Sequence, residues 1–303
     1  MPNMNQDEKF LRSYIKKNNN WGRWISKSDS GAVNLITKSK VIQATKLVKS
    51  GRTVSLSRPW PIKATRENPQ PAIRYVMSTE DEVSGGAFDY ISASYHGHSV
   101  THIDSLCHFW NKDGMWEGKL AKDEIKHDGV LSGSVDAWKN GIITRCVLID
   151  IPKYRNQQYV TQDKPVTDIE LEDAIQKQNL KISPGDAVAI YSGRELYAQD
   201  NQDTWGGHSS MPGLHASCLK FIRDNDISVV IWDMLDVIPM HYGPEINVHT
   251  AISAFGVVLL DNALLEPLSI VCQEENKYEF MVTINPLVIP GGTGSPVNPI
   301  AIF

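Results

Sequence analysis

The sequence lacks any stretch that would place it in a membrane or on a polyanion. It contains no run of about 18 apolar residues, and its first twenty residues have no apolar core of a signal peptide. Basic residues form no block, and the formal net charge is -5. We therefore expect a cytoplasmic protein that contacts neither membrane nor nucleic acid and whose partner is a small molecule.

Cysteine is scarce, and its placement is uninformative. The four cysteines lie far apart and match no CxxC metal spacing, so neither a disulfide framework nor a cysteine-bound zinc is expected. Buried free thiols are the better interpretation. These residues are Cys107, Cys146, Cys218 and Cys272.

Two common catalytic motifs are also missing. The glycine-rich run from Pro290 to Pro296 has neither the lysine nor the following helix of a phosphate-binding loop. No GxSxG sequence occurs, which argues against a serine hydrolase built around a nucleophile elbow.

The patterns that are present predict an α/β domain. A chain of 303 residues with 41% hydrophobic residues can bury a large core, and no linker divides it, so we expect one domain over 1–303. Helices are predicted at 38–50, 167–178 with a capping box, 212–223 and 248–254. Strands are predicted at 53–57, 87–95, 146–151, 187–191, 228–232, 257–260 and 280–284.

Histidines are concentrated in one short segment. Four of the nine fall between residues 96 and 108, and His98, His102 and Asp104 form a HxxxHxD pattern. Imidazole nitrogens and carboxylate oxygens suit Zn or Mn, and three protein ligands leave a position for water. A metal held there would lower the pKa of its water, and His108 would be left to move protons.

The spacing within this segment predicts a turn. His98 and His102 share a face if the chain is helical, whereas His102 and Asp104 share a face if it is extended. His96 lies one residue out of phase with the pattern, so its roles as ligand and as bystander stay open.

The segment His98-Ser-Val-Thr-His102-Ile-Asp104-Ser-Leu-Cys-His108 resembles the HxGTHxDxPxH signature of the cyclase-like metal-dependent hydrolases, which include bacterial kynurenine formamidases and isatin hydrolases. Similar segments elsewhere cover nearly the whole chain. They are Trp21-Gly-Arg-Trp24, Gly31-Ala-Val-Asn-Leu-Ile-Thr37, Ser55-Leu-Ser-Arg-Pro59 and Pro290-Gly-Gly-Thr-Gly-Ser-Pro296.

The resemblance implies roles for individual residues. His98, His102 and Asp104 would bind the metal, and His108 would be the catalytic acid/base. Val100 and Leu106 replace a glycine and a proline of the signature, which changes the local turn without removing a ligand.

A second metal site is implied by a later pair of residues. His249 and Asp261 are twelve positions apart, as are the second-site ligands of some relatives. Asp261 stands where kynurenine formamidases carry glutamate, and its shorter side chain reaches less far. One divalent ion, Zn or Mn, is therefore expected and a second is possible.

The resemblance also implies a fold and an assembly. The expected core is a mixed β-sheet surrounded by helices, of the swivelling β/β/α type, with residues 1–52 as a mainly helical N-terminal extension. Relatives usually form homo-oligomers, so a dimer or tetramer is expected.

Other polar and aromatic residues remain open. His208, His215 and His241 are expected to be structural or exposed, although one could line the pocket. Asp233 and Asp236 follow a predicted strand and could line a site or cap backbone amides. Phe109, Trp110 and Trp116 could form an apolar wall or belong to the core.

Together these features predict a hydrolase that uses metal-activated water to cleave a carbon-nitrogen bond of a small amide or cyclic amide. A lactonase, or a cyclase or lyase acting through an enolate, would use the same ligands. A non-enzymatic metal-binding protein is the third alternative. The sequence does not identify the substrate or choose between Zn and Mn.

Overall fold

A large mixed β-sheet forms the centre of the computed structural model, which describes residues 6–65, 68–201 and 210–303. Its nine strands run in the order β1-β13-β11-β7-β8-β9-β10-β4-β12. The four central strands, β7 to β10, are parallel, and the strands on both sides of them are antiparallel. The predicted α/β fold with a mixed sheet core and surrounding helices is confirmed.

The strands of this sheet are short except for β7. They are β1 (Thr53–Ser55), β4 (His102–Asp104), β7 (Ile142–Asp150), β8 (Ala187–Tyr191), β9 (Val229–Trp232), β10 (Val258–Asp261), β11 (Glu279–Ile284), β12 (Gly294–Pro296) and β13 (Ile300–Ile302). A two-stranded hairpin, β5 (Ile125–Lys126) and β6 (Gly129–Val130), lies outside it.

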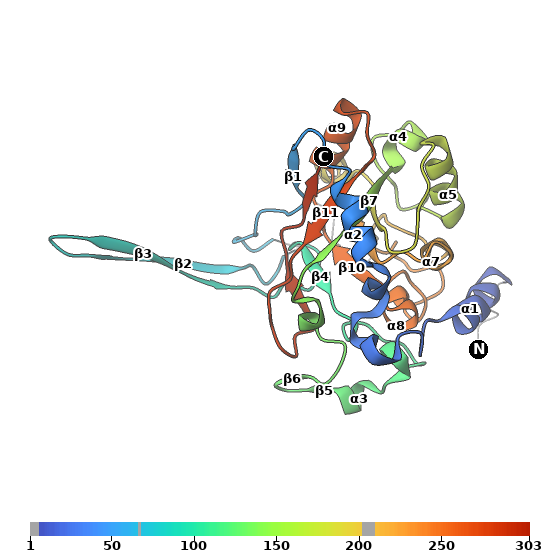
Figure 1. Cartoon of the computed structure of the whole chain (residues 1–303), viewed down its shortest axis with the longest axis horizontal. Helices are drawn as coiled ribbons and strands as arrows, with labels where there is room; N and C mark the ends of the chain where they lie inside the picture. Colours follow the sequence, from blue (N-terminus) through green and yellow to red (C-terminus); the bar gives the residue numbers. More distant parts are fainter. Residues whose placement is uncertain (1–5, 66–67, 202–209) are drawn as a thin grey trace.

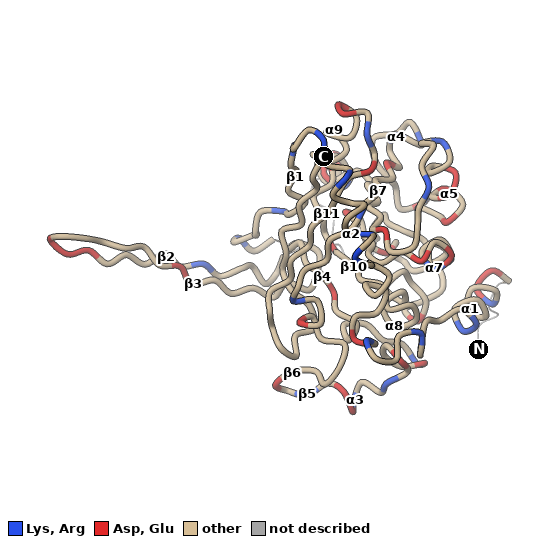
Figure 2. Tube along the Cα trace, in the orientation of Figure 1, with Lys and Arg blue, Asp and Glu red and all other residues tan. Residues whose placement is uncertain are grey.

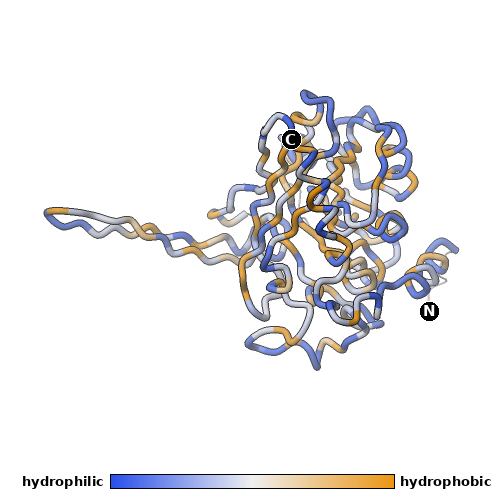
Figure 3. The backbone as a smooth tube through the Cα atoms, in the orientation of Figure 1, coloured by the Kyte–Doolittle hydropathy of each residue, from blue (hydrophilic) through white to orange (hydrophobic). Residues whose placement is uncertain are grey.

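The parallel centre explains why these strands are nearly all apolar. Strands β8, β9 and β10 are buried at every position. Parallel strands are covered on both faces, so their sequences read as continuous hydrophobic runs instead of alternating. Figure 3 shows this hydrophobic interior beneath more hydrophilic helices.

Helices pack around the sheet and against each other (Figure 1). Helix α2 contacts β7 and β11, α9 contacts β1 and β7, and α1, α7 and α8 contact one another. The α-helices are α1 (Gln6–Asn18), α2 (Lys38–Thr45), α3 (Ala121–Glu124), α4 (Ile151–Arg155), α5 (Asp168–Lys177), α6 (Arg194–Asp200), α7 (Cys218–Asp224), α8 (Thr250–Phe255) and α9 (Glu266–Glu274). Three 3₁₀ segments are η1 (Ile25–Leu35), η2 (Trp116–Gly118) and η3 (Val135–Trp138).

Two helix predictions have different outcomes. The capping box before α5 is present, with Thr167 accepting from the Glu170 amide while the Glu170 side chain accepts from the Thr167 amide. The helix predicted to begin at Pro212 begins only at Cys218. Residues Met211 and Leu214 instead form β-bridges, so this stretch is held extended by its neighbours.

A long hairpin projects from the body of the molecule. Strands β2 (Ile73–Glu80) and β3 (Gly85–Ser92) pair antiparallel and extend away from the sheet, as Figure 1 shows. The strand predicted at 87–95 is β3, which ends three residues earlier than expected. Its partner β2 was not predicted.

Among the helices of the described residues, none is both long and apolar enough to span a bilayer.

Candidate metal centre

The histidine-rich segment enters the sheet as strand β4. This short strand is buried between β10 and β12, with antiparallel partners on both sides. Its register places His102 opposite Asp261 of β10. Residues directly opposite each other on antiparallel strands point to the same face, so residues 159 positions apart in sequence meet here.

The carboxylate of Asp104 lies at the middle of the cluster. It is fully buried, and neither of its oxygens has a hydrogen-bond partner. Four imidazole nitrogens surround it: His96 Nδ1 at 3.0 Å, His102 Nε2 at 3.4 Å, His108 Nε2 at 3.8 Å and His249 Nε2 at 3.9 Å. A buried carboxylate that accepts no hydrogen bond is unfavourable unless positive charge lies beside it, so this arrangement favours a cation or protonated imidazoles.

Two groups of side chains in the described residues have the composition and spacing of metal ligands. The first is His96, His102 and Asp104, and the second is Asp104, His249 and Asp261. Within each group the donor atoms lie within 4.8 Å of one another. Asp104 belongs to both groups, so one carboxylate could serve two adjacent ions. Nitrogen and oxygen donors of this kind fit a divalent transition metal.

Contacts outside the cluster fix the orientation of the histidines. The His102 Nδ1 lies 2.8 Å from the Val100 carbonyl oxygen, and the His249 Nδ1 lies 2.5 Å from Asp236 Oδ2. When the rings are neutral, donating Nδ1–H to these oxygens leaves each Nε2 as the unprotonated nitrogen, directed into the cluster. Such a second contact is typical of metal-bound histidine.

Asp261, the other carboxylate of the second group, is oriented in a similar way. Trp232 donates its indole N–H to Asp261 Oδ1 at 2.5 Å, which leaves Oδ2 facing His249 Nε2 at 3.4 Å. Asp236 lies beside the site, as the sequence allowed: it contacts His249 of the second ligand group but belongs to neither group itself.

His96, and not His98, lies in a candidate ligand group of the described residues. His98 belongs to neither ligand group, and its backbone carbonyl accepts a hydrogen bond from the Arg194 guanidinium. The chain forms bends over 96–100 instead of a helical turn. The His96 Nδ1 lies 3.0 Å from Asp104 Oδ1, so His96 shares a group of closely spaced donor atoms with His102 and Asp104.

A buried polar network holds this bend in place. Asn262 donates to the carbonyl oxygens of Gly97 at 2.7 Å and Val100 at 3.1 Å. Arg194 in turn donates to the Asn262 side-chain oxygen at 2.8 Å. The loop that carries the first ligands is thus fixed by residues far away in the sequence.

The glycine-rich run near the C-terminus supports His96. The Thr293 hydroxyl lies 3.0 Å from His96 Nε2. A Cβ added at Gly294 would lie 2.8 Å from the His96 ring and 2.5 Å from the Ile103 carbonyl oxygen, so only glycine fits this approach. This glycine-rich run therefore helps to shape the candidate metal centre.

His108 differs from the proposed ligands in accessibility. Its ring stacks on His96 at 4.0 Å, and its side chain is 28% exposed, compared with 2% for His102. Burial within the protein lowers the pKa of His108 to about 4. The ring is therefore neutral at pH 7 and can accept a proton from a group that enters the site.

The remaining titratable groups favour bound positive charge. Burial opposes protonation of His102 and His249, but adjacent carboxylates outweigh it, so the pKa of His102 rises to about 8 and that of His249 rises well above its usual value. Burial would raise the pKa of Asp104, yet the His102 and His108 imidazoles hold it well below its usual range. A metal ion would supply the same positive charge without a proton.

Two aromatic rings lie beside the histidine cluster. Phe109 and Trp232 lie with ring centroids 5.8 Å and 5.4 Å from that of His249. Trp116 is buried and donates to the Ser28 carbonyl, so it belongs to the core. Trp110 is exposed.

Among the described residues, His215 and His241 lie outside the two ligand groups. His215 and His241 contact each other, with ring centroids 4.9 Å apart. His208 lies outside the described residues.

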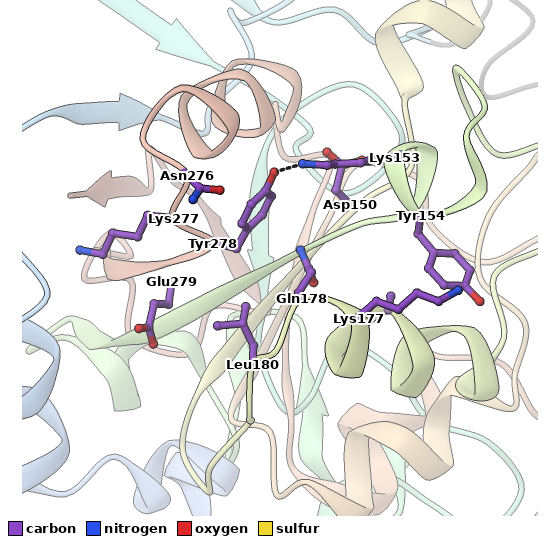
Figure 4. A pocket seen from close by; sticks show the side chains of 11 residues that line it. Asp150, Lys153, Tyr154, Lys177, Gln178, Leu180, Asn276, Lys277, Tyr278 and Glu279 are labelled. Atoms are coloured by element: carbon purple, nitrogen blue, oxygen red, sulfur yellow. Dashed lines mark hydrogen bonds between the residues drawn. The ribbon is translucent and has the colours of Figure 1, made fainter.

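A separate cavity of about 550 Å³ lies where β7, α5 and β11 meet (Figure 4). Its lining includes Lys153, Lys177 and Tyr278 but no histidine or cysteine, and Lys153 contacts the Tyr278 hydroxyl. Because it lacks metal-binding nitrogens, it is not a candidate for the chemistry that the histidine cluster supports.

Comparison with known proteins identifies the family of this chain. The family model described as putative cyclase matches residues 47–237, which include the whole histidine segment. The chain belongs to the putative cyclase family. That match ends before His249 and Asp261, so the second ligand group rests on the geometry of this structure.

Solved structures of putative cyclases and hydrolases share the fold. A novel cyclase superposes with a TM-score of 0.83 at 25% identity, over 95% of this chain and 99% of that chain. An isatin hydrolase bound to the product analogue thioisatinate gives 0.57 at 16% identity, over 87% and 94%. Isatin hydrolase A from Ralstonia solanacearum gives 0.57 at 16%, over 82% and 91%. Among curated proteins, none matches this chain.

Proposed function

We propose that this putative cyclase is a metal-dependent hydrolase that cleaves a carbon-nitrogen bond in a small amide or cyclic amide. The observation that carries the proposal is the buried Asp104 carboxylate, which has no hydrogen-bond partner and lies among histidine nitrogens. The isatin hydrolases that share the fold are named for cleaving a cyclic amide.

His96, His102 and Asp104 would hold one divalent ion, and Asp104, His249 and Asp261 would hold a second. When bound, Zn or Mn supplies a Lewis acid that polarises a carbonyl and acidifies water. The proposed ligand set thus replaces His98 by His96 and keeps the other four predicted ligands.

His108 is the proposed proton carrier. In hydrolysis, the oxygen of water adds to the carbonyl carbon, and the carbon-nitrogen bond then breaks. His108, neutral and partly exposed, accepts a proton from the attacking water and returns it to the departing nitrogen. Its position 3.8 Å from Asp104 keeps the proton carrier beside the reacting atoms.

Phe109 and Trp232 favour a flat substrate. Both rings lie against the His249 imidazole, so a planar amide or an aromatic ring could stack beside the ligands. Hydrolysis of a lactone would use the same residues. Assays with both kinds of substrate distinguish an amidohydrolase from a lactonase.

The test is metal analysis of the wild type and His102→Ala, with hydrolysis assays on N-formylkynurenine, isatin and simple lactones. His241→Ala is the matched control, because this exposed histidine lies outside the ligand groups. We expect stoichiometric metal and turnover of one substrate class in the wild type and the control, and loss of both in His102→Ala.

Two results would overturn the proposal. The first is a folded wild type that binds neither Zn nor Mn when supplied with them. The second is a metal-loaded wild type that turns over lactones but no amide, which would assign the site to carbon-oxygen bonds.

A further inference from the structure

Helix α8 connects one proposed ligand to the opposite end of the chain. His249 is the residue directly before α8, at its N-cap position. The other four members of the two ligand groups lie in strands β4 and β10 or in the loop before β4. The placement of His249 therefore depends on a helix, whereas the placement of the others depends on the sheet.

The C-terminal end of α8 has unusual partners. The last carbonyl groups of a helix find no partner within it, and all of α8 is buried, so these groups need donors from outside the helix. The Trp21 indole N–H donates to the Ser253 carbonyl oxygen at 2.7 Å. Asn20 donates its backbone amide to the Ala254 carbonyl oxygen and its side-chain amide to that of Phe255, each at 2.9 Å. Two consecutive residues near the N-terminus thus satisfy three consecutive carbonyl groups of α8.

The residue after α8 is also covered by the N-terminal part of the chain. Ala32 donates its amide to the Gly256 carbonyl oxygen at 2.7 Å. A Cβ on Gly31 would lie 2.3 Å from that oxygen, and a Cβ on Gly256 would lie 2.8 Å from the Trp116 ring. Only glycine allows backbones to approach this closely, so the two segments are in direct backbone contact.

Charged side chains join helix α1 to the loop that leads into α8. The Glu245 carboxylate lies 3.1 Å from the Arg12 guanidinium and 2.8 Å from the Lys112 ammonium group. Figure 2 shows both acidic and basic residues along α1. Because solvent-exposed ion pairs contribute little, the less exposed hydrogen bonds of Asn20 and Trp21 are expected to hold α8 more firmly.

Asp236 holds the opposite end of α8. Its Oδ1 accepts from the Val248 amide at 2.6 Å, and its Oδ2 lies 2.5 Å from His249 Nδ1. The helix has six residues, so fewer than two turns separate its ends. A displacement of the C-terminal end therefore moves His249 as well.

We infer that Asn20 and Trp21 are positioning residues of the second ligand group. By capping α8 they set the distance at which His249 faces Asp261 and Asp104, without touching any of the three. The inference rests on the proposed function, because it concerns the second ion of that centre. The N-terminal segment is thus part of the machinery that holds the metal.

The first ligand group has separate supports. His96 contacts the Thr293 hydroxyl, Asn262 holds the bend at 97–100, and β4 pairs with strands on both sides. None of these contacts involves Asn20, Trp21 or α8. Loss of the helix cap should therefore weaken the second ion selectively.

The test is calorimetric titration of the metal-free full chain with Zn, comparing the wild type with Trp21→Phe and with Asn20→Ala. Each variant removes one hydrogen bond to α8 and keeps the aromatic ring or the backbone amide. We expect two ions in the wild type. Each variant should bind the second ion roughly 10-fold more weakly and the first ion unchanged, as for loss of a contact outside the ligands.

Thr167→Ala is the matched control. It removes the cap of α5, a helix that carries no member of the ligand groups. Urea denaturation measures the stability lost in each variant. If Asn20 and Trp21 served the fold alone, their variants would bind both ions as tightly as this control does.

A second measurement does not depend on metal. In the metal-free protein, the amides of 250–256 should exchange with deuterium faster in both variants, while those of β4 keep their wild-type rates. Unchanged affinity for the second ion in both variants, or a wild type that binds one ion, would overturn the inference. Either result leaves an ion bound in the wild type, whereas failure of the proposed function leaves none.

Discussion

Two buried aspartates near the end of the same sheet have opposite surroundings. Asp233 accepts hydrogen bonds from the backbone amides of Ser192, Gly193, Arg194 and Met234, at 2.9 to 3.1 Å. Asp104 is equally buried and accepts none. The first carboxylate accepts hydrogen bonds from four backbone amides, whereas the second is surrounded by imidazole nitrogens. Burial alone therefore does not distinguish the two carboxylates, whereas the groups that surround each of them do.

The largest effect is expected at the unsatisfied aspartate. Asp104→Asn removes the charge shared by both ligand groups, so metal and turnover should be lost together while the fold is kept. The loss of metal affinity should exceed the roughly 10- to 100-fold typical of contacts outside the ligands. Equilibrium dialysis with Zn measures the metal affinity of the variant. If a folded Asp104→Asn variant retained metal, Asp104 would not differ from Asp233 in metal binding.

The next effect separates two neighbouring histidines. His96→Ala should lose metal from the first group, while His98→Ala should keep it, because only His96 faces Asp104. Metal content of the two purified variants, measured side by side, decides between the two assignments. The reverse result would restore His98 as the ligand.

His108→Gln should retain metal but reduce kcat by roughly 10²- to 10⁴-fold, the usual contribution of a proton carrier. Burial lowers the pKa of His108 to about 4, so its basic form is present above that value and is lost as pH falls through it. The acid limb of kcat/KM should accordingly lie well below pH 6. An acid limb near pH 6.5 would disagree with this assignment.

A smaller loss is expected for the residue that orients His249. Asp236→Asn keeps the size of the side chain but weakens the contact with His249 Nδ1, so metal affinity should fall roughly 10- to 100-fold. Competition with a chelator measures the change. Unaltered affinity would show that Asp236 matters only for the fold.

The smallest effect on metal is expected at the satisfied aspartate. Asp233→Asn replaces an acceptor by a group that cannot satisfy all four amides, so the free energy of unfolding should fall by about 1–3 kcal/mol. Urea denaturation measures the fall, and dialysis should find metal affinity unchanged. If Asp233→Asn lost metal affinity without losing stability, Asp233 and Asp104 would not differ in role as described here.

The core of this fold could be predicted because its strands are buried on both faces. The stretch 187–191 is all apolar and becomes β8, and Gly256 ends α8 in the left-handed conformation. Strand β2 was missed although Ile73, Tyr75 and Met77 alternate with smaller or polar residues. This alternation was the available signal, but it lies beyond a proline-rich loop and on an exposed hairpin.

The metal centre was predicted in part for a related reason. His102 and Asp104 lie in one extended strand, so their spacing in sequence is also their spacing in space. The choice between His96 and His98 depends on bends held by Asn262 and by the Thr293–Gly294 segment. Those contacts join residues far apart in sequence, and local spacing does not reveal them.

The central claim is that Asp104 and the surrounding histidines hold a divalent metal. The most direct measurement is a crystal structure of protein purified with Zn, with anomalous scattering recorded at the zinc absorption edge. The account predicts a peak within about 2.0–2.2 Å of both Asp104 and the His102 Nε2, with His96 as a further ligand. A zinc-saturated crystal with no peak at Asp104, or with a peak ligated by His98 and not His96, would contradict it.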